Sequence, residues 1–147
     1  MDSPEPRKDS MHVPDEFLLD LRRLLRSDGM LDDVEVARRR WRVSRIDDKS
    51  IFGDDARRLA NAFRSQRSCS FYVARVCDLL ASAPVTAYRF DATEGDVERF
   101  QGPSYYDTNL DDCLLFNIPV SCVVFRPGVV DTTIFAGDAG FIREIDV

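Results

Sequence analysis

The sequence predicts a single α+β domain in which N-terminal helices pack on a C-terminal, mainly antiparallel β-meander. The chain has 147 residues, of which 44% are hydrophobic and 31% charged, and this composition is typical of a globular domain. In the first half, apolar residues recur at helical spacing. In the second half, short runs of β-branched and aromatic residues are divided by Gly, Pro and Asp, which is the pattern of strands and turns.

The N-terminal segment differs in composition from the rest of the chain. Residues 1–13 carry two prolines, several charges and few apolar side chains, so they bury too little surface to offset the entropy lost on ordering. We therefore expect 1–13 to be a flexible tail and 14–147 to form the domain. A chain of this length buries enough surface to fold without disulfides or a structural metal.

Two helices are expected near the start of the domain. Pro14 and two acidic residues precede apolar side chains spaced along one helical face, which predicts a helix ending by Gly29. Residues 31–43 fit a second helix. The alternation of Val34 and Val36 also permits a strand there.

Two further helices are expected before the strand-rich half. Asp54 and Asp55 begin an amphipathic segment that predicts a helix to about Gln66. Residues 70–83 are apolar on most sides, so we expect a buried central helix that ends before Pro84. The opening of this segment, SCSFYV, could instead be extended.

Five short runs are expected to be strands, at residues 85–90, 113–118, 121–128, 129–137 and 140–147. The last four are separated by only a few residues, and such short connections join antiparallel neighbours. The glycines of GDAG suit a tight reversal before the last run. The runs VVDTTIF and GFIREI are apolar enough to form an edge that pairs with a second copy, so a homodimer is one expectation.

Charge limits the partners that the chain can attract. The formal net charge is -6, from 26 acidic and 20 basic residues, which argues against bulk binding to nucleic acid or anionic lipid. No apolar run approaches the roughly 20 residues that span a bilayer, and the N-terminus lacks the apolar core of a signal peptide. We therefore expect a cytoplasmic protein that does not enter the membrane.

Several catalytic classes lack the residues that they need. The single histidine, His12, lies in the expected tail, which disfavours a Ser–His or Cys–His nucleophile pair. Neither of the glycine-rich phosphate-binding patterns, G-x-x-x-x-G-K-[ST] and G-x-G-x-x-G, is present. Lys8 and Lys49 are the only lysines, which disfavours Schiff-base chemistry.

The thiols and carboxylates do not form a recognisable site either. The cysteines form no Cys-x-x-Cys pair, so we interpret them as reduced core side chains. A reactive thiol is the alternative. We expect no cofactor. Adjacent aspartates diverge on a helix and point to opposite faces of a strand, so we interpret their pairs as solvated surface acids. The alternative is a small carboxylate- or magnesium-dependent enzyme. The cysteines are Cys69, Cys77, Cys113 and Cys122, and the aspartate pairs are 32/33, 47/48, 54/55 and 111/112.

Acidic residues are concentrated in the second half, which has a net charge of -7 from Ser68 onward against +1 before it. They are densest between residues 91 and 112, where aromatic side chains are interleaved and Arg99 is the only basic residue. Such a surface can steer a basic partner while its tyrosines supply contact area, although the acids could also simply solvate a loop. The predicted partner-binding residues are Asp91, Glu94, Asp96, Glu98, Tyr105, Tyr106, Asp107, Asp111 and Asp112.

A second charged segment has the opposite sign. Five arginines surround Trp41, and such a run could contact phosphates while the indole stacks on a base. On a helix these arginines would spread around the circumference, and nearby aspartates could compensate them, so ion pairing or a solvated face is the preferred interpretation. An acidic protein partner is a further alternative. The arginines are Arg38, Arg39, Arg40, Arg42 and Arg45.

In size, acidity and α+β layout, residues 14–147 resemble the immunity proteins that bacteria make to neutralise a co-encoded toxin. The resemblance implies a cytoplasmic, antitoxin-like protein without enzymatic activity. Its acidic, tyrosine-containing surface would cover the active site of a cognate basic toxin such as a nuclease. The alternatives are a small carboxylate- or metal-dependent enzyme and a regulator that contacts nucleic acid through Arg38–Arg45.

Overall fold

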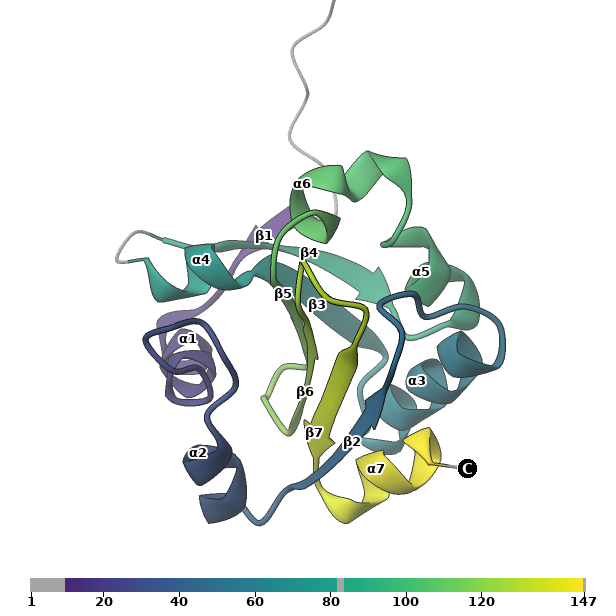
Figure 1. Cartoon of the computed structure of the whole chain (residues 1–147), viewed down its shortest axis with the longest axis horizontal. Coiled ribbons are helices and arrows are strands. Elements are labelled where there is room, and N and C mark those ends of the chain that lie inside the picture. The colour runs from purple at the N-terminus through teal and green to yellow at the C-terminus, as the bar shows by residue number, and fades with distance from the viewer. Residues whose placement is uncertain (1–9, 82–83, 147) are drawn as a thin grey trace, which may run out of the picture.

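The computed structural model describes residues 10–81 and 84–146, which form one antiparallel seven-stranded sheet with helices on both faces (Figure 1). The strand order is β1-β4-β3-β5-β6-β7-β2, and the α+β prediction is confirmed. The strands are β1 (Ser10–His12), β2 (Arg42–Ile46), β3 (Ser70–Arg75), β4 (Thr86–Asp91), β5 (Cys113–Phe116), β6 (Cys122–Arg126) and β7 (Thr133–Gly137). The helices are α1 (Asp15–Arg23), α2 (Asp33–Arg38), α3 (Asp54–Ser65), α4 (Val76–Leu80), α5 (Glu94–Arg99), the 3₁₀ turn η1 (Pro103–Tyr105), α6 (Tyr106–Asn109) and α7 (Ala139–Ile145).

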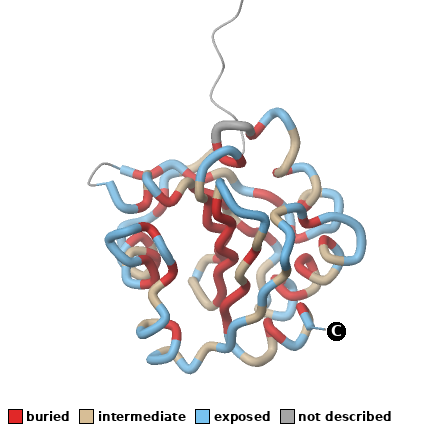
Figure 2. The backbone as a smooth tube through the Cα atoms, in the orientation of Figure 1, coloured by how far each residue is buried: buried red, intermediate tan, exposed pale blue. Residues whose placement is uncertain are grey.

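The sheet is covered on both faces, and its central strands supply two separate cores. Every residue of β5 and β6 is buried, and this stretch is red in Figure 2. Alternate side chains point to opposite faces, so Leu115 and Val124 join one core while Leu114 and Phe125 join the other. A continuous apolar run, rather than an alternating one, is what a strand with two covered faces requires.

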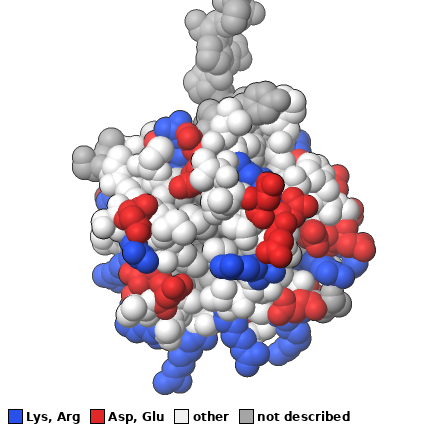
Figure 3. Space-filling model, in the orientation of Figure 1, with Lys and Arg blue, Asp and Glu red and all other residues white. Residues whose placement is uncertain are grey.

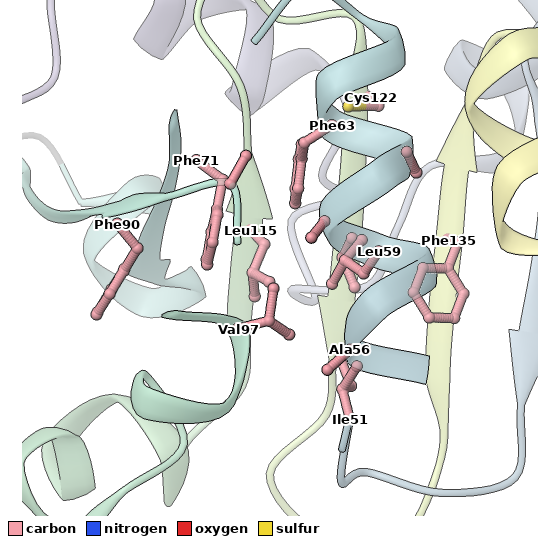
Figure 4. Packing of buried hydrophobic residues seen from close by; sticks show 14 of the residues in the cluster. Ile51, Ala56, Leu59, Phe63, Phe71, Phe90, Val97, Leu115, Cys122 and Phe135 are labelled. Carbon is pink, nitrogen blue, oxygen red and sulfur yellow. The ribbon is translucent and has the colours of Figure 1, made fainter. Parts of the chain in front are cut away.

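The first core lies between the sheet and helices α3, α5 and α7, and Figure 4 shows its centre. The ring centroids of Phe63 and Phe71 are 5.1 Å apart and the rings are stacked. Phe90 continues the row at 5.4 Å from Phe71, while Phe100 meets Phe71 edge-on. The second core, on the opposite face, is formed with residues of α1, α2 and α4.

The predicted elements between 14 and 66 are confirmed in part. The helices α1 and α3 occur where the apolar spacing places them, each with two acidic residues in its first turn. The second helix is shorter than expected, because Arg40 adopts a left-handed conformation with φ of 59° and ends the helical stretch. The chain then continues as β2, so the prediction of one helix over 31–43 is wrong for its second half.

The prediction of a central helix over 70–83 is wrong for most of its length. Residues 70–75 form β3, which pairs with both β4 and β5, and only Val76–Leu80 is helical. An element that is buried on all sides is apolar at nearly every position, whether it is a strand or a helix. Its sequence then has no periodicity that could distinguish a strand from a helix. The alternative of an extended SCSFYV segment is the one that the structure adopts.

The last run, predicted as a strand over 140–147, is helix α7 in the part that the structure describes. The Asp138 side chain accepts a hydrogen bond from the Phe141 N–H at 2.9 Å and caps the helix, so GDAG starts a helix instead of closing a hairpin. Phe141, Ile142 and Ile145 are buried at helical spacing. The strands predicted between 85 and 137 are confirmed as β4, β5, β6 and β7, but β7 begins at Thr133, so residues 129–132 of the predicted run 129–137 lie in the connection before it.

The ends of the sheet differ from the sequence-based expectation. Ser10–His12 form β1, which pairs with β4, and Val13 is buried, so the ordered fold begins before the expected residue 14. VVDTTIF supplies β7, an internal strand, and GFIREI supplies a helix. The expectation that these runs provide a free edge is therefore wrong, and the edge strands are β1 and β2.

One arginine is buried in the first core. Arg126 is 3% exposed, and its Nε and Nη2 donate to the Lys49 carbonyl at 3.1 and 2.9 Å. Its Nη1 donates to Asn109 Oδ1 at 2.8 Å, and the guanidinium lies 5.0 Å from the centroid of the Phe100 ring. In the described segments, no carboxylate forms an ion pair with Arg126. Neutral carbonyl dipoles and an aromatic face therefore stabilise the charge.

Replacing Arg126 by lysine should destabilise the fold. A lysine has its donors on a single nitrogen and cannot span both the Lys49 carbonyl and Asn109 Oδ1, so buried acceptors are left unpaired. We expect Arg126→Lys to lower the free energy of unfolding by about 2–4 kcal/mol, measured by denaturant titration. The exposed Arg143→Lys control should stay within about 0.5 kcal/mol of the parent. Equal midpoints for both variants would contradict this role.

Candidate functional site

The acidic stretch 91–112 is mostly ordered into helices, and this removes part of the predicted binding surface. Tyr105 is 3% exposed and packs edge-on against Phe90, with ring centroids 5.0 Å apart. Its hydroxyl accepts a hydrogen bond from Arg99 Nη1 at 3.0 Å. The prediction that Tyr105 contacts a partner is therefore wrong, because the 3₁₀ turn directs this ring into the core.

Two of the predicted acids hold the structure together. Asp96 Oδ2 accepts the Asp91 N–H at 2.7 Å and Oδ1 accepts Arg99 Nε at 3.1 Å. Burial by itself would raise the pKa of Asp96, but these hydrogen bonds bring it below its ordinary value. Glu98 Oε2 accepts the Gly53 N–H at 2.9 Å and links α5 to the start of α3.

Four further predicted residues of this stretch have different positions. Asp91 and Glu94 are exposed, so they are available to a partner. The backbones of Tyr106 and Asp107 belong to α6, but their side chains lie outside the part of the chain that the structure describes. Their assignment to a binding surface stays a prediction.

Asp111 and Asp112 lie at a groove that joins four distant segments. The groove has a volume of about 430 Å³ and lies between the loop after α1, helix α4, the approach to β5 and the loop after β6. Among the described residues, its lining includes three aspartates and no lysine or arginine. The acidic lining is Asp28, Asp111 and Asp112, and the apolar lining is Val76, Leu80, Leu110 and Val129.

Polar contacts fix the walls of the groove. Asp112 Oδ1 accepts the Gly128 N–H at 2.6 Å, and the Asp112 carbonyl accepts the Val76 N–H at 2.9 Å. The Lys49 ammonium donates to the carbonyls of Asn109 and Gly128. A Cβ on Gly128 would lie 2.8 Å from the Leu110 carbonyl oxygen, so only glycine allows the two loops to approach this closely.

Two carboxylates on the rim of the groove can accept further hydrogen bonds from a partner. Asp28 and Asp111 have side chains that are 49% and 55% exposed. Asp28 pairs with Arg26 at 2.9 Å, whereas the nearest basic group to Asp111, Arg75, is 3.6 Å away. Each carboxylate has room for further hydrogen bonds, since two oxygens offer about four acceptor positions.

Large apolar side chains stand exposed beside these carboxylates. Leu110 is 70% and Val129 is 92% exposed, and Leu80 also reaches solvent. This combination was not predicted, because Val129 was expected to lie in a strand and Asp28 was not among the predicted binding residues. The signal in the sequence was an apolar pair, Val129–Val130, directly after the turn-forming Pro127–Gly128.

In the described part of the chain, the cysteines and the histidine do not come together in a catalytic or metal-binding group. Cys113 and Cys122 are buried, and burial raises the pKa of both thiols. Cys69 and Cys77 are exposed, so the interpretation of all four cysteines as core residues is wrong for these two. Cys69 directly precedes β3, and Cys77 lies in α4. His12 is exposed on β1. Among residues 10–81 and 84–146, no group of three or more His, Cys, Asp or Glu side chains could hold a metal ion.

The arginine-rich segment is only partly neutralised. Arg38 Nη2 and Arg39 Nε bind Glu35 Oε2 at 2.7 and 2.8 Å, and Arg39 also lies 5.3 Å from the centroid of the Trp41 ring. Arg40, Arg42 and Arg45 are exposed and form no ion pair with a carboxylate of the described residues. On the face shown in Figure 3, basic side chains gather along the edge near α2 and β2, and acidic ones gather over the connection from β2 to α3.

Comparisons with protein-family models, with curated proteins and with solved structures gave no match to this chain. In the described ranges, no helix combines the length and the apolar character needed to cross a membrane.

The two neighbouring aspartates of the groove should differ in their effect on stability. Asp112→Asn weakens the acceptor of the Gly128 N–H, which costs about 1–2 kcal/mol of unfolding free energy. Asp111→Asn should change it by less than about 0.5 kcal/mol, because its side chain is exposed and its contact with Arg75 is long. Denaturant titration measures both. A larger loss for Asp111→Asn than for Asp112→Asn would contradict the assigned roles.

The ion pairs of Glu35 predict a specific acid dependence. Hydrogen bonds from Arg38 and Arg39 lower the pKa of Glu35 from 4.5 to about 2. Because the folded pKa is depressed, the pairs stabilise the fold above about pH 4.5 and the contribution is lost as the pH falls toward 2. Glu35→Gln should therefore be less stable than the parent at pH 6, with the difference closing by pH 2. NMR titration of the Glu35 carboxyl carbon with a midpoint near 4.5 would refute the assignment.

Proposed function

We propose that this chain is a cytoplasmic, immunity-type protein that binds and neutralises a basic protein partner, and that the partner docks at the groove bordered by Asp28 and Asp111. The observation that carries the proposal is the lining of the groove, which in the described part of the chain combines three carboxylates and exposed apolar side chains without a basic residue. A surface with this composition favours a partner that presents lysine or arginine beside apolar residues.

The two kinds of lining residue contribute differently to such binding. Asp28 and Asp111 form charge-assisted hydrogen bonds to incoming basic side chains and steer their approach. Leu110 and Val129 are the anchors, because burying each side chain contributes roughly 1.5–3 kcal/mol. The wall contacts of Asp112 and Lys49 preorganise the site, which lowers the entropy cost of binding.

The class of partner follows from the resemblance to immunity proteins together with the charge of the groove. A toxin that acts on nucleic acid carries a basic surface at its active site, and a carboxylate-lined groove is complementary to it. A bacterial cytoplasm is the setting in which such a neutralising protein acts. The groove, which keeps Asp111 and Asp112, replaces the earlier part of the stretch 91–112 as the proposed centre of the interface. In that earlier part, Tyr105, Asp96 and Glu98 are engaged within the fold.

A charge-reversal pair tests the groove against the remainder of the acidic stretch. The probe is the purified product of the adjacent reading frame, and the Kd is measured at two salt concentrations by calorimetry. Asp28→Lys with Asp111→Lys should weaken binding at least tenfold, about 1.4 kcal/mol or more. Asp91→Lys with Glu94→Lys is the matched control, which makes the same charge change at the end of β4 and the start of α5 and should leave the Kd within about threefold.

Each other result has a definite meaning. Loss of binding only in the Asp91 and Glu94 variant would move the interface from the groove to the junction of β4 and α5. No binding by the parent protein at either salt concentration would overturn the proposal for that partner. Saturable binding of a small ligand or of magnesium in the groove, abolished by the Asp28 and Asp111 changes, would favour the enzyme alternative.

A further inference from the structure

The edge strand β2 is a second candidate surface, and its charge is opposite to that of the groove. It is the last strand in the sheet order, so β7 pairs with one of its sides, and no strand of the described residues pairs with the other. It has five residues, whereas the edge strand at the opposite end of the sheet, β1, has three. Figure 1 shows β2 as the outermost strand of its side of the sheet.

The side chains of β2 are unusually exposed. Arg42, Val43 and Arg45 all face solvent, and Val43 is 51% exposed. Arg40, just before the strand, is exposed as well. No ion pair joins these arginines to a carboxylate of the described segments, in contrast to Arg38 and Arg39, which share Glu35. An open strand edge thus coincides with exposed arginines that form no ion pair within the described segments.

The alternation of side chains along β2 restricts what can bind there. Arg42 shares one face of the sheet with Ser44 and Ile46, while Val43 and Arg45 point to the opposite face. A phosphate backbone runs along one side of a protein surface and would meet only one of these two arginines. An added strand has side chains on both faces and reaches both of them.

We infer that β2 accepts an acidic, extended segment of a partner protein as an additional antiparallel strand. Opposite residues of two paired strands share a face, so the residues facing Arg45 and Arg42 are i and i+3 of the added segment. The recognised pattern is therefore acid-x-apolar-acid, in which the apolar residue faces Val43. Main-chain hydrogen bonds supply affinity, and the two acidic positions supply specificity.

The same register disfavours a second copy of this chain. Antiparallel self-pairing centred on Ser44 sets Val43 against Arg45 of the other copy and gathers four arginines along one seam. Like charges on neighbouring positions of paired strands are destabilising. Charge therefore selects an acidic partner strand over a homodimer.

The test uses the full-length protein and the synthetic peptide TTETVETT, labelled for fluorescence anisotropy. A peptide of identical composition, TTEETVTT, has its acids adjacent and controls for charge alone. We expect saturable binding of the first peptide and at least tenfold weaker binding of the second. N-methylation of the valine and of the threonine before it should also weaken binding at least tenfold, because one of these two amides points toward β2.

Matched variants locate the site on the protein. Arg42→Glu with Arg45→Glu should weaken peptide binding at least tenfold, whereas Arg57→Glu with Arg64→Glu, the same charge change on α3, should leave it within about threefold. Unchanged melting temperatures show that both variants are folded. Equal binding of the two peptides, or indifference to N-methylation, would overturn the inference.

Two measurements exclude the other occupants. A thymidine oligonucleotide of fifteen residues should neither bind at 150 mM salt nor displace the peptide; binding that depends on Arg42 and Arg45 would assign the surface to nucleic acid instead. Sedimentation should give a monomer, and a dimer abolished by the same two changes would assign it to a second copy. None of these results depends on the groove, because all the variants lie outside its lining.

Discussion

The arrangement of this fold depends on the buried guanidinium of Arg126, which forms no ion pair with a carboxylate of the described residues. Arg126 cannot lose its proton, so the surrounding chain must supply acceptors in fixed positions. They come from the main chain at Lys49 and the side chain of Asn109, which are distant from β6 in sequence. Their convergence fixes the β2–α3 connection and the α5–α6 segment against the sheet. Lys49 extends the same set of contacts to Gly128, so the walls of the groove are positioned by it as well.

Secondary structure could be predicted from the sequence where an element buries one face, and less well where it buries two. Helix α3 has one apolar face, and its spacing identified it. Strand β3 is covered on both faces, so its composition matched a buried helix equally well. Helix α7 was missed because its apolar spacing over 141–145 also suits a short strand, and the decisive feature is a cap, Asp138, that lies outside the run. The two-sided core required the pairing of residues far apart in sequence, which local patterns do not encode.

The candidate site could be predicted only at the level of charge. Acidity in the second half identified Asp111 as a surface acid. The surplus of carboxylates did not distinguish it from Asp96, which accepts hydrogen bonds from Asp91 of β4 and Arg99 of α5. Asp28 is contributed by the opposite half of the chain, which is nearly neutral. The groove exists because the loops at 28, 110 and 128 meet at one end of the sheet, and no sequence window contains all three.

The close contact at Gly128 fixes the backbone of the loop after β6 but does not restrict the side chain that follows it. The backbone at this residue lies too close to the carbonyl of Leu110 for any side chain, so the course of the loop is fixed. The next residue, Val129, is 92% exposed and packs on little of the protein. Divergence at that single position could change the surface offered to partners while the scaffold stays intact. Substitutions at that position could therefore change the chemistry of the groove's rim while each successive sequence still folds.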